Sequence, residues 1–200
     1  MSAGSAGEPI VNTASHTASR STYSRLLQSA ITPTAVAIAM AVLAFASLPL
    51  DRAIVAALAA TALVVLSTID LERRIIPNRI VLPAAAVVLL AQLALFPGHA
   101  LEWALAPLLA ALFLVLPQLF NRASIGMGDV KLGLLMGTTL GWAVFSALIV
   151  AFLCAFPIAL LTLVRGGAEA RKATIPLGPF LSLGTLFILF APHISGLPGS

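Results

Sequence analysis

The sequence predicts an all-α polytopic membrane protein with about seven transmembrane helices and a cytoplasmic N-terminus. Of its 200 residues, 60% are hydrophobic and 9% are charged, whereas an ordinary globular domain is about 25% charged. Long apolar runs recur at about the 20-residue length that crosses roughly 30 Å of hydrocarbon. Basic residues stand singly or in pairs beside these runs, which orients membrane proteins. We therefore expect a lipid bilayer as a partner and exclude nucleic acid, despite the net charge of +4.

Composition divides the chain into three regions. Residues 1–30 are rich in Ser, Ala, Gly and Thr and predict a flexible cytoplasmic tail. No long apolar core follows a charged start within the first 25 residues, which excludes a cleavable signal peptide. Residues 31–195 form the predicted helical membrane domain, and 196–200 form a short C-terminal tail.

The first half of the membrane domain predicts four helices. Apolar runs over 31–50 and on to Ile69 form a helical hairpin, with Pro49 in its turn. A third helix is predicted over 79–96, with Asn78 as its N-cap. The fourth covers about 101–120.

The apolar stretch 132–164 is too long for one crossing. A break at 138–142 divides it into a short helix, about 128–140, and a full one, about 143–164. The short helix covers only about 20 Å, so it completes a crossing only if it starts below the membrane surface. A polar loop over 165–174 and a last helix over 179–194 follow.

Charge placement supports seven crossings. With a cytoplasmic N-terminus, the loops at 70–79, 121–131 and 165–174 lie inside. Every Lys and Arg except Arg52 is then in these loops or in the N-terminal tail. This asymmetry agrees with the positive-inside rule, whereas one merged helix over 132–164 would move the basic residues after it outside.

Neither a metal nor a cofactor is predicted. The single cysteine, Cys154, lies in an apolar run and cannot form an internal disulfide or a CxxC metal site. We predict that it is a buried packing thiol. His99 is predicted to lie in water, because no partner for a ligand role is near it in the sequence.

Two aspartates, Asp70 and Asp129, are predicted at one depth at the cytoplasmic face. Asp70 closes the second helix and Asp129 opens the fifth, and apolar sequence flanks both. A carboxylate in such a place is costly unless it has a function. Two of them can share a proton, so that one acts as general base toward water and the other as general acid toward a carbonyl. The spacing alone leaves the alternative that Asp70 pairs with Arg73 or Arg74 and that Asp129 is a helix N-cap.

Gly126 and Gly128 flank the Asp129 position. Because they lack side chains, a substrate backbone or a neighbouring helix can come close to the carboxylate, although ordinary loop and packing use explains them equally. Lys131 is either an anchor that snorkels to lipid headgroups or a group that tunes the aspartate pair.

Three motifs occur in order: Asp70 ahead of Ile76-Pro77-Asn78, then Gly126-Met127-Gly128-Asp129, then Ile175-Pro176-Leu177-Gly178-Pro179-Phe180. The second matches the GxGD motif, and together they resemble the type IV prepilin peptidases over about residues 50–190. The resemblance implies an aspartic-type endopeptidase of the inner (plasma) membrane. Its active site would lie at the cytoplasmic face. Its substrates would be prepilin-like proteins of type IV pilus or protein secretion systems. The enzyme would remove their basic leader by cleaving on the cytoplasmic side of the subunit's hydrophobic helix. Implied catalytic residues are Asp70 and Asp129, and motif support comes from Gly126, Gly128, Lys131, Pro77, Asn78, Pro176, Gly178 and Pro179.

The chain departs from the larger bacterial members. It has one cysteine and no long cytoplasmic insertion, so it resembles the compact form without the paired-CxxC zinc domain. Nothing in it indicates the N-methyltransferase activity of those members. The presenilin branch is a poorer match, because Ile69 rather than Tyr precedes Asp70 and no PAL motif lies downstream.

The competing interpretation is a non-enzymatic transporter or an assembly scaffold. A transporter would need polar or broken-helix sites near the bilayer midplane. The predicted midplane segments have almost no ionisable residues, and the acidic residues gather at one face.

Overall fold

The computed structural model describes residues 32–120, 126–170 and 176–191, without the side chains at 118–120, 163 and 166–170. These residues form α-helices and short turns with no strand, which confirms the all-α class. The two predicted tails and parts of the two predicted loops, residues 121–125 and 171–175, lie outside these ranges.

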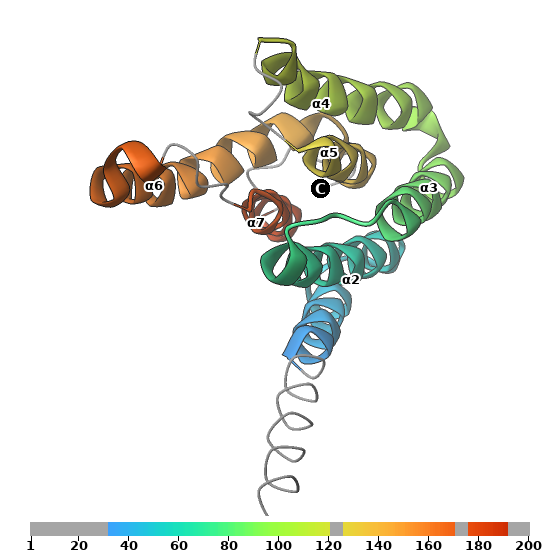
Figure 1. The fold of residues 1–200 in the computed structure, drawn as a ribbon. Coiled ribbons are helices and arrows are strands. Elements are labelled where there is room, and N and C mark those ends of the chain that lie inside the picture. The colour runs from blue at the N-terminus through green and yellow to red at the C-terminus, as the bar shows by residue number, and fades with distance from the viewer. Residues whose placement is uncertain (1–31, 121–125, 171–175, 192–200) are drawn as a thin grey trace, which may run out of the picture.

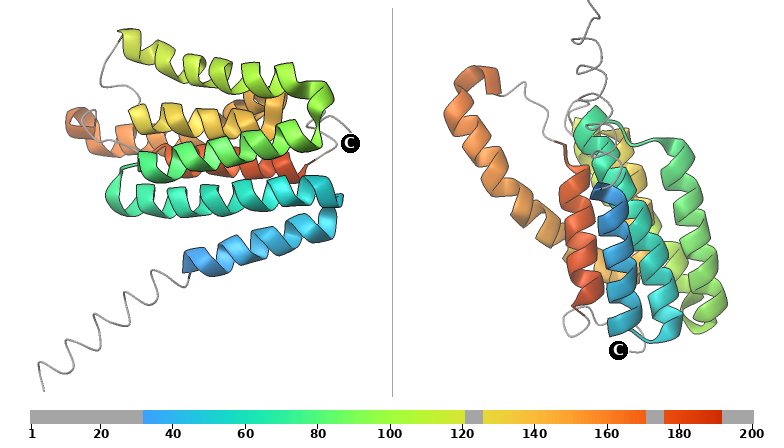
Figure 2. Two further views of the ribbon diagram at one scale, coloured as in Figure 1. Left: turned by 90° about the vertical axis from the view of Figure 1, so that its right-hand side faces the viewer. Right: turned by 90° about the horizontal axis from the view of Figure 1, so that it is seen from below.

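The helices run back and forth along one bundle axis (Figures 1 and 2). The first described helix, Thr32–Ser47, forms the predicted hairpin with the helix that follows it. The later elements are α2 (Leu50–Arg73), α3 (Asn78–Leu95), the 3-10 turn η1 (Pro97–His99), α4 (Ala100–Phe120), α5 (Met127–Leu140), the 3-10 turn η2 (Gly141–Ala143), α6 (Val144–Ala170) and α7 (Gly178–Phe190).

The structure confirms one predicted break and corrects two predicted helix boundaries, the start of the loop at residue 165 and the N-cap of the third predicted helix. The predicted break near 140 is confirmed by η2, where Gly141 adopts φ +57°. The polar loop predicted from residue 165 was wrong at its start, because α6 continues to Ala170. Ala and Glu are strong helix formers and extend the helix beyond its apolar part. Asn78 is not the N-cap of α3: Pro77 holds that position and Asn78 is the first helical residue.

Among the residues that the structure describes, four segments are long and apolar enough to cross a membrane: Leu50–Arg73, Asn78–Leu95, Pro97–Pro117 and Met127–Thr162. The last of these joins α5 and α6 into one apolar stretch, although the 3-10 turn η2 separates them into two helices. Two shorter apolar helices, Thr32–Ser47 and Gly178–Phe190, complete the bundle.

Helix α5 occupies the centre of the bundle and packs against α4, α3 and α7 (Figure 1). Gly133 and Gly137, one turn apart, face α4 at very short range. A Cβ on Gly133 would lie 2.7 Å from Leu114 Cδ1, and a Cβ on Gly137 would lie 2.6 Å from the Pro107 nitrogen. Small residues at this spacing let two membrane helices approach closely. This packing fixes the helix that carries Asp129.

Helix α6 starts in the bundle and then diverges from it (Figures 1 and 2). Its first half is buried at Val144, Ala147 and Ala151, whereas later apolar side chains such as Phe156 and Val164 are exposed. Cys154 is exposed too, so the prediction of a buried thiol was wrong. The sequence of α6 is apolar on all sides, and its tilt decides which side chains are covered.

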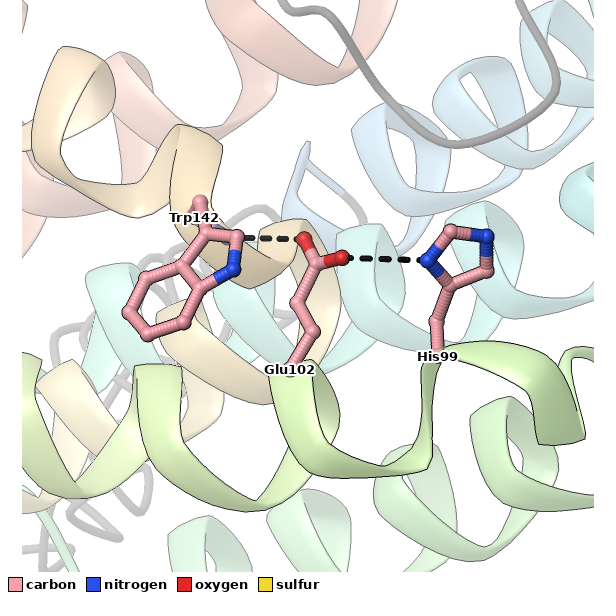
Figure 3. Close-up of polar contacts among 3 residues, drawn as sticks. All are labelled: His99, Glu102 and Trp142. Carbon is pink, nitrogen blue, oxygen red and sulfur yellow. Dashed lines mark hydrogen bonds and ion pairs between the residues drawn. The ribbon is translucent and has the colours of Figure 1, made fainter.

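A polar contact secures the bundle end opposite Asp129 (Figure 3). Glu102 in α4 accepts a hydrogen bond from the backbone N–H of Trp142 at 3.0 Å, next to the α5–α6 reversal. Its other oxygen lies 3.4 Å from His99 Nδ1. His99 is half exposed, as predicted for a residue in water, but it has a partner three residues along the chain. Any side chain at Gly141 would contact the Glu102 carboxylate.

Candidate active site

Asp70 lies in the last turn of α2 and is only 6% exposed. The helix ends at Arg73, and its C-cap Arg74 adopts the left-handed conformation with φ 54° and donates its N–H to the Asp70 carbonyl at 2.8 Å. Pro77 then prevents the α2 helix from continuing, because it disfavours helical geometry at the preceding residue. The carboxylate therefore stays inside the bundle while the chain turns away from it.

The Asp70 side chain forms no ion pair within the described part of the chain; the one pair found there joins His99 and Glu102. The alternative that Asp70 is a helix-end charge paired with Arg73 or Arg74 is therefore not supported. Both arginines are exposed, whereas the aspartate is buried.

Asp129 lies in the first turn of α5 and is partly buried. The N-cap position of this helix is held by Gly126, so Asp129 is not the N-cap. Its own N–H donates to the Gly126 carbonyl at 3.0 Å. A carboxylate in the first turn is stabilised by the positive end of the helix dipole.

One cavity brings the two aspartates together. Its volume is about 230 Å³, and it is lined by Asp70, Arg74, Ile75, Ile76, Gly126, Met127, Gly128 and Asp129. Asp70 and Asp129 are near enough for their charges to interact. A water molecule occupies about 30 Å³ of liquid, so the cavity has room for a few waters or a peptide group. Two carboxylates around such a space can take a proton from water and give one to a carbonyl.

Gly178 brings the downstream motif to the same place. Its backbone N–H, at the start of α7, donates to Asp70 Oδ2 at 3.1 Å. A Cβ at this position would lie 2.6 Å from the same oxygen, so only glycine fits without displacing the carboxylate. Pro179, in the first turn of α7, and Pro176, just before the helix, flank this contact.

The two glycines beside Asp129 have different surroundings. A Cβ on Gly126 would lie 3.3 Å from Asp129 Oδ2. On Gly128 it would lie 2.9 Å from the Cβ of Ile76, in the α2–α3 connection. Gly128 thus permits close packing between this connection and α5, whereas Gly126 leaves space beside the carboxylate.

Lys131 and Asn78 also meet at this end of the bundle. The Lys131 ammonium donates to Asn78 Oδ1 at 2.6 Å, which joins the second turn of α5 to the first residue of α3 across 53 positions of the sequence. The pair is exposed and lies beside the cavity but does not line it. Lys131 therefore has a protein partner that neither of its two predicted roles included.

Two contributors to the cavity have no clear sequence signal. The left-handed conformation of Arg74 is unexpected for a residue with a side chain, because this region favours glycine and asparagine. Ile75 is one of many aliphatic residues and reaches the cavity because α2 ends before it. Both positions depend on how the α2–α3 connection folds.

The fold and the site define a class: a protein of apolar, membrane-type helices with two aspartates in one cavity at the end of the bundle. A sequence model of the type IV leader peptidase family matches residues 57–164, and the chain belongs to this family. No curated protein and no solved structure matches the chain. The matched segment contains both aspartates but ends before Gly178, whose contact with Asp70 is seen in the structure.

Proposed function

We propose that this protein is an intramembrane aspartic endopeptidase that removes the basic leader of prepilin-like subunits. The observation that carries the proposal is the shared cavity of Asp70 and Asp129. The ionised carboxylate takes a proton from water as the water oxygen attacks the scissile carbonyl carbon, and the protonated carboxyl gives its proton to the carbonyl oxygen. The carboxyl group that took the water proton then gives it to the amide nitrogen, the other carboxylate takes a hydroxyl proton from the tetrahedral intermediate, and the C–N bond breaks.

The proposed setting is the inner membrane, with about seven crossings and the aspartates at the cytoplasmic face. The distribution of basic residues supports this orientation, because Arg73, Arg74, Arg79 and Lys131 all lie at the aspartate end of the bundle. A leader that stays in the cytoplasm would reach the cavity from that side. Family membership supports a prepilin-like substrate.

Co-expression with a prepilin-like substrate tests the proposal. Asp70→Asn and Asp129→Asn should each lower leader removal on the order of 10²–10⁴-fold, because each removes one proton-transferring group. Asp51→Asn, at the other end of α2, is the matched control and should cleave normally. Membrane insertion of all three variants is followed in parallel. Leader removal that survives both active-site substitutions would exclude the two-aspartate mechanism, and no leader removal by the wild-type protein would favour a scaffold or transporter.

A further inference from the structure

A long groove lies between the helix Thr32–Ser47, α2 and α7. Its volume is about 590 Å³, and its walls include Val36 and Leu43 from the first helix and Leu183 and Phe187 from α7. These four side chains are about half exposed: Val36 is 50%, Leu43 44%, Leu183 52% and Phe187 51% exposed. The first helix diverges from α2 toward its own N-terminal end, which opens the groove on the aspartate side (Figure 2).

The groove begins beside the candidate active site. Pro179, which lines it, directly follows Gly178, the residue whose N–H binds Asp70. Ser67, on the opposite wall, precedes Asp70 by three residues and so lies on a neighbouring face of α2. The aspartate end of the groove therefore lies next to the Asp70–Gly178 contact, although the groove and the cavity share no lining residue.

The chemistry of the lining changes along the groove. The hydroxyl groups of Ser67, Thr68 and Ser182 lie at the aspartate end, and Leu186, Phe187 and Phe190 form the far end. Ser67 and Thr68 donate to carbonyls of their own helix, at 2.7 Å to Leu63 and 2.8 Å to Val65. The groove therefore presents few free donors and suits an apolar occupant.

The occupant follows from the position of the groove. A polypeptide that continues from the cavity into hydrocarbon must satisfy its backbone groups internally, so it must be helical. From Pro179 to Phe190 the groove extends roughly 17 Å at about 1.5 Å per residue, more than half the hydrocarbon thickness. We propose that it binds the apolar helix of the substrate that follows the scissile bond. This inference rests on the proposed peptidase function.

A second apolar groove, between α2 and α3, provides a comparison. Its volume is about 490 Å³, but its lining ends at Val65 and Ile80 and includes no residue next to Asp70, Asp129 or Gly178. On α2 its lining stops at Val65, five residues before Asp70, whereas that of the first groove reaches Thr68. Val87, in this second groove, is 50% exposed, and its exposure is close to that of Val36 and Leu183 in the first groove.

Groove-filling variants of the full chain in lipid nanodiscs test the proposal. Val36→Trp and Leu183→Trp should raise KM for a helix-bearing prepilin-like substrate about tenfold with little change in kcat, because they remove binding shared by the ground and transition states. Both groove variants should cleave a short leader peptide that lacks the apolar helix, and they should do so at the wild-type rate. Val87→Trp is the control and should leave both reactions unchanged. Unchanged KM in the two groove variants would overturn the proposal.

Photo-crosslinking gives an independent readout. A benzoylphenylalanine at position 187 in the Asp70→Asn background should crosslink to the substrate helix, whereas one at position 87 should not. Crosslinks from position 187 only to lipid, or to the chain's own residues before Thr32, would overturn the groove assignment. If the wild-type protein cleaves neither substrate, the peptidase proposal fails, and the crosslinks still decide whether the groove binds the helix.

Discussion

The backbone N–H of Gly178 donates to Oδ2 of Asp70 at 3.1 Å, between residues 108 positions apart in the sequence. This contact joins the start of α7 to the end of α2 and holds one carboxylate oxygen in place. A backbone donor is a suitable restraint, because it cannot rotate away as a side chain can. The other oxygen of Asp70 can then serve the cavity that it shares with Asp129.

Gly178→Ala should lower leader cleavage on the order of 10²-fold, the scale expected when a catalytic group moves by about 1 Å. The added Cβ would lie 2.6 Å from Asp70 Oδ2 and must displace the carboxylate. Single-turnover cleavage in detergent measures the effect. Gly98→Ala is the control, since a Cβ there meets nothing within 4 Å. Equal activity of the two variants would show that the Gly178 contact does not position Asp70.

Gly137→Ala should destabilise the protein by about 1–3 kcal/mol, the usual cost of overpacking. Its Cβ would press on the backbone of Pro107, which cannot move aside. Gly133→Ala should be nearly neutral, because it meets the end of the flexible Leu114 side chain. The gain in helix propensity, about 1 kcal/mol, offsets that contact. Unfolding in detergent micelles compares the two; equal stabilities would contradict the assigned packing.

Lys131 and Asn78 should show a coupling energy of about 0.5–1 kcal/mol, at the low end of contacting pairs because their hydrogen bond is exposed to solvent. The measurement is a double-mutant cycle in stability with Lys131→Met, Asn78→Ala and the double variant. Additive effects would mean that their 2.6 Å contact contributes nothing measurable. In that case the interaction of Lys131 with lipid headgroups would be its main role.

Glu102→Ala should lower stability by about 0.5–1.5 kcal/mol, because the Trp142 N–H loses its acceptor beside the α5–α6 reversal. Glu102→Gln keeps an acceptor oxygen and should lose less. Neither should change kcat/KM for leader cleavage, since this contact lies at the end of α5 opposite Asp129. If the Gln variant were as unstable as the Ala variant, the pairing with His99 would be the stabilising interaction.

Local sequence patterns predicted most helices correctly. The hairpin around Pro49 and the division of the long apolar stretch near residue 140 both agree with the structure. Proline, glycine and run length act on neighbouring residues, so their effects can be read along the chain. The extension of α6 beyond residue 165 was missed, because its polar sequence suggested a loop although its Ala and Glu favour helix.

The sequence by itself determined the class of the protein and its candidate residues. The apolar runs require a membrane, and the ordered motifs around Asp70 and Asp129 indicate a leader peptidase, a family confirmed by the match over residues 57–164. The tertiary structure decided which groups meet: Gly178 with Asp70, Lys131 with Asn78, and Gly128 with Ile76. It also placed Cys154 on the outer face of a diverging helix. These outcomes depend on how whole helices pack against one another, and no local pattern along the chain encodes the distance between residues so far apart.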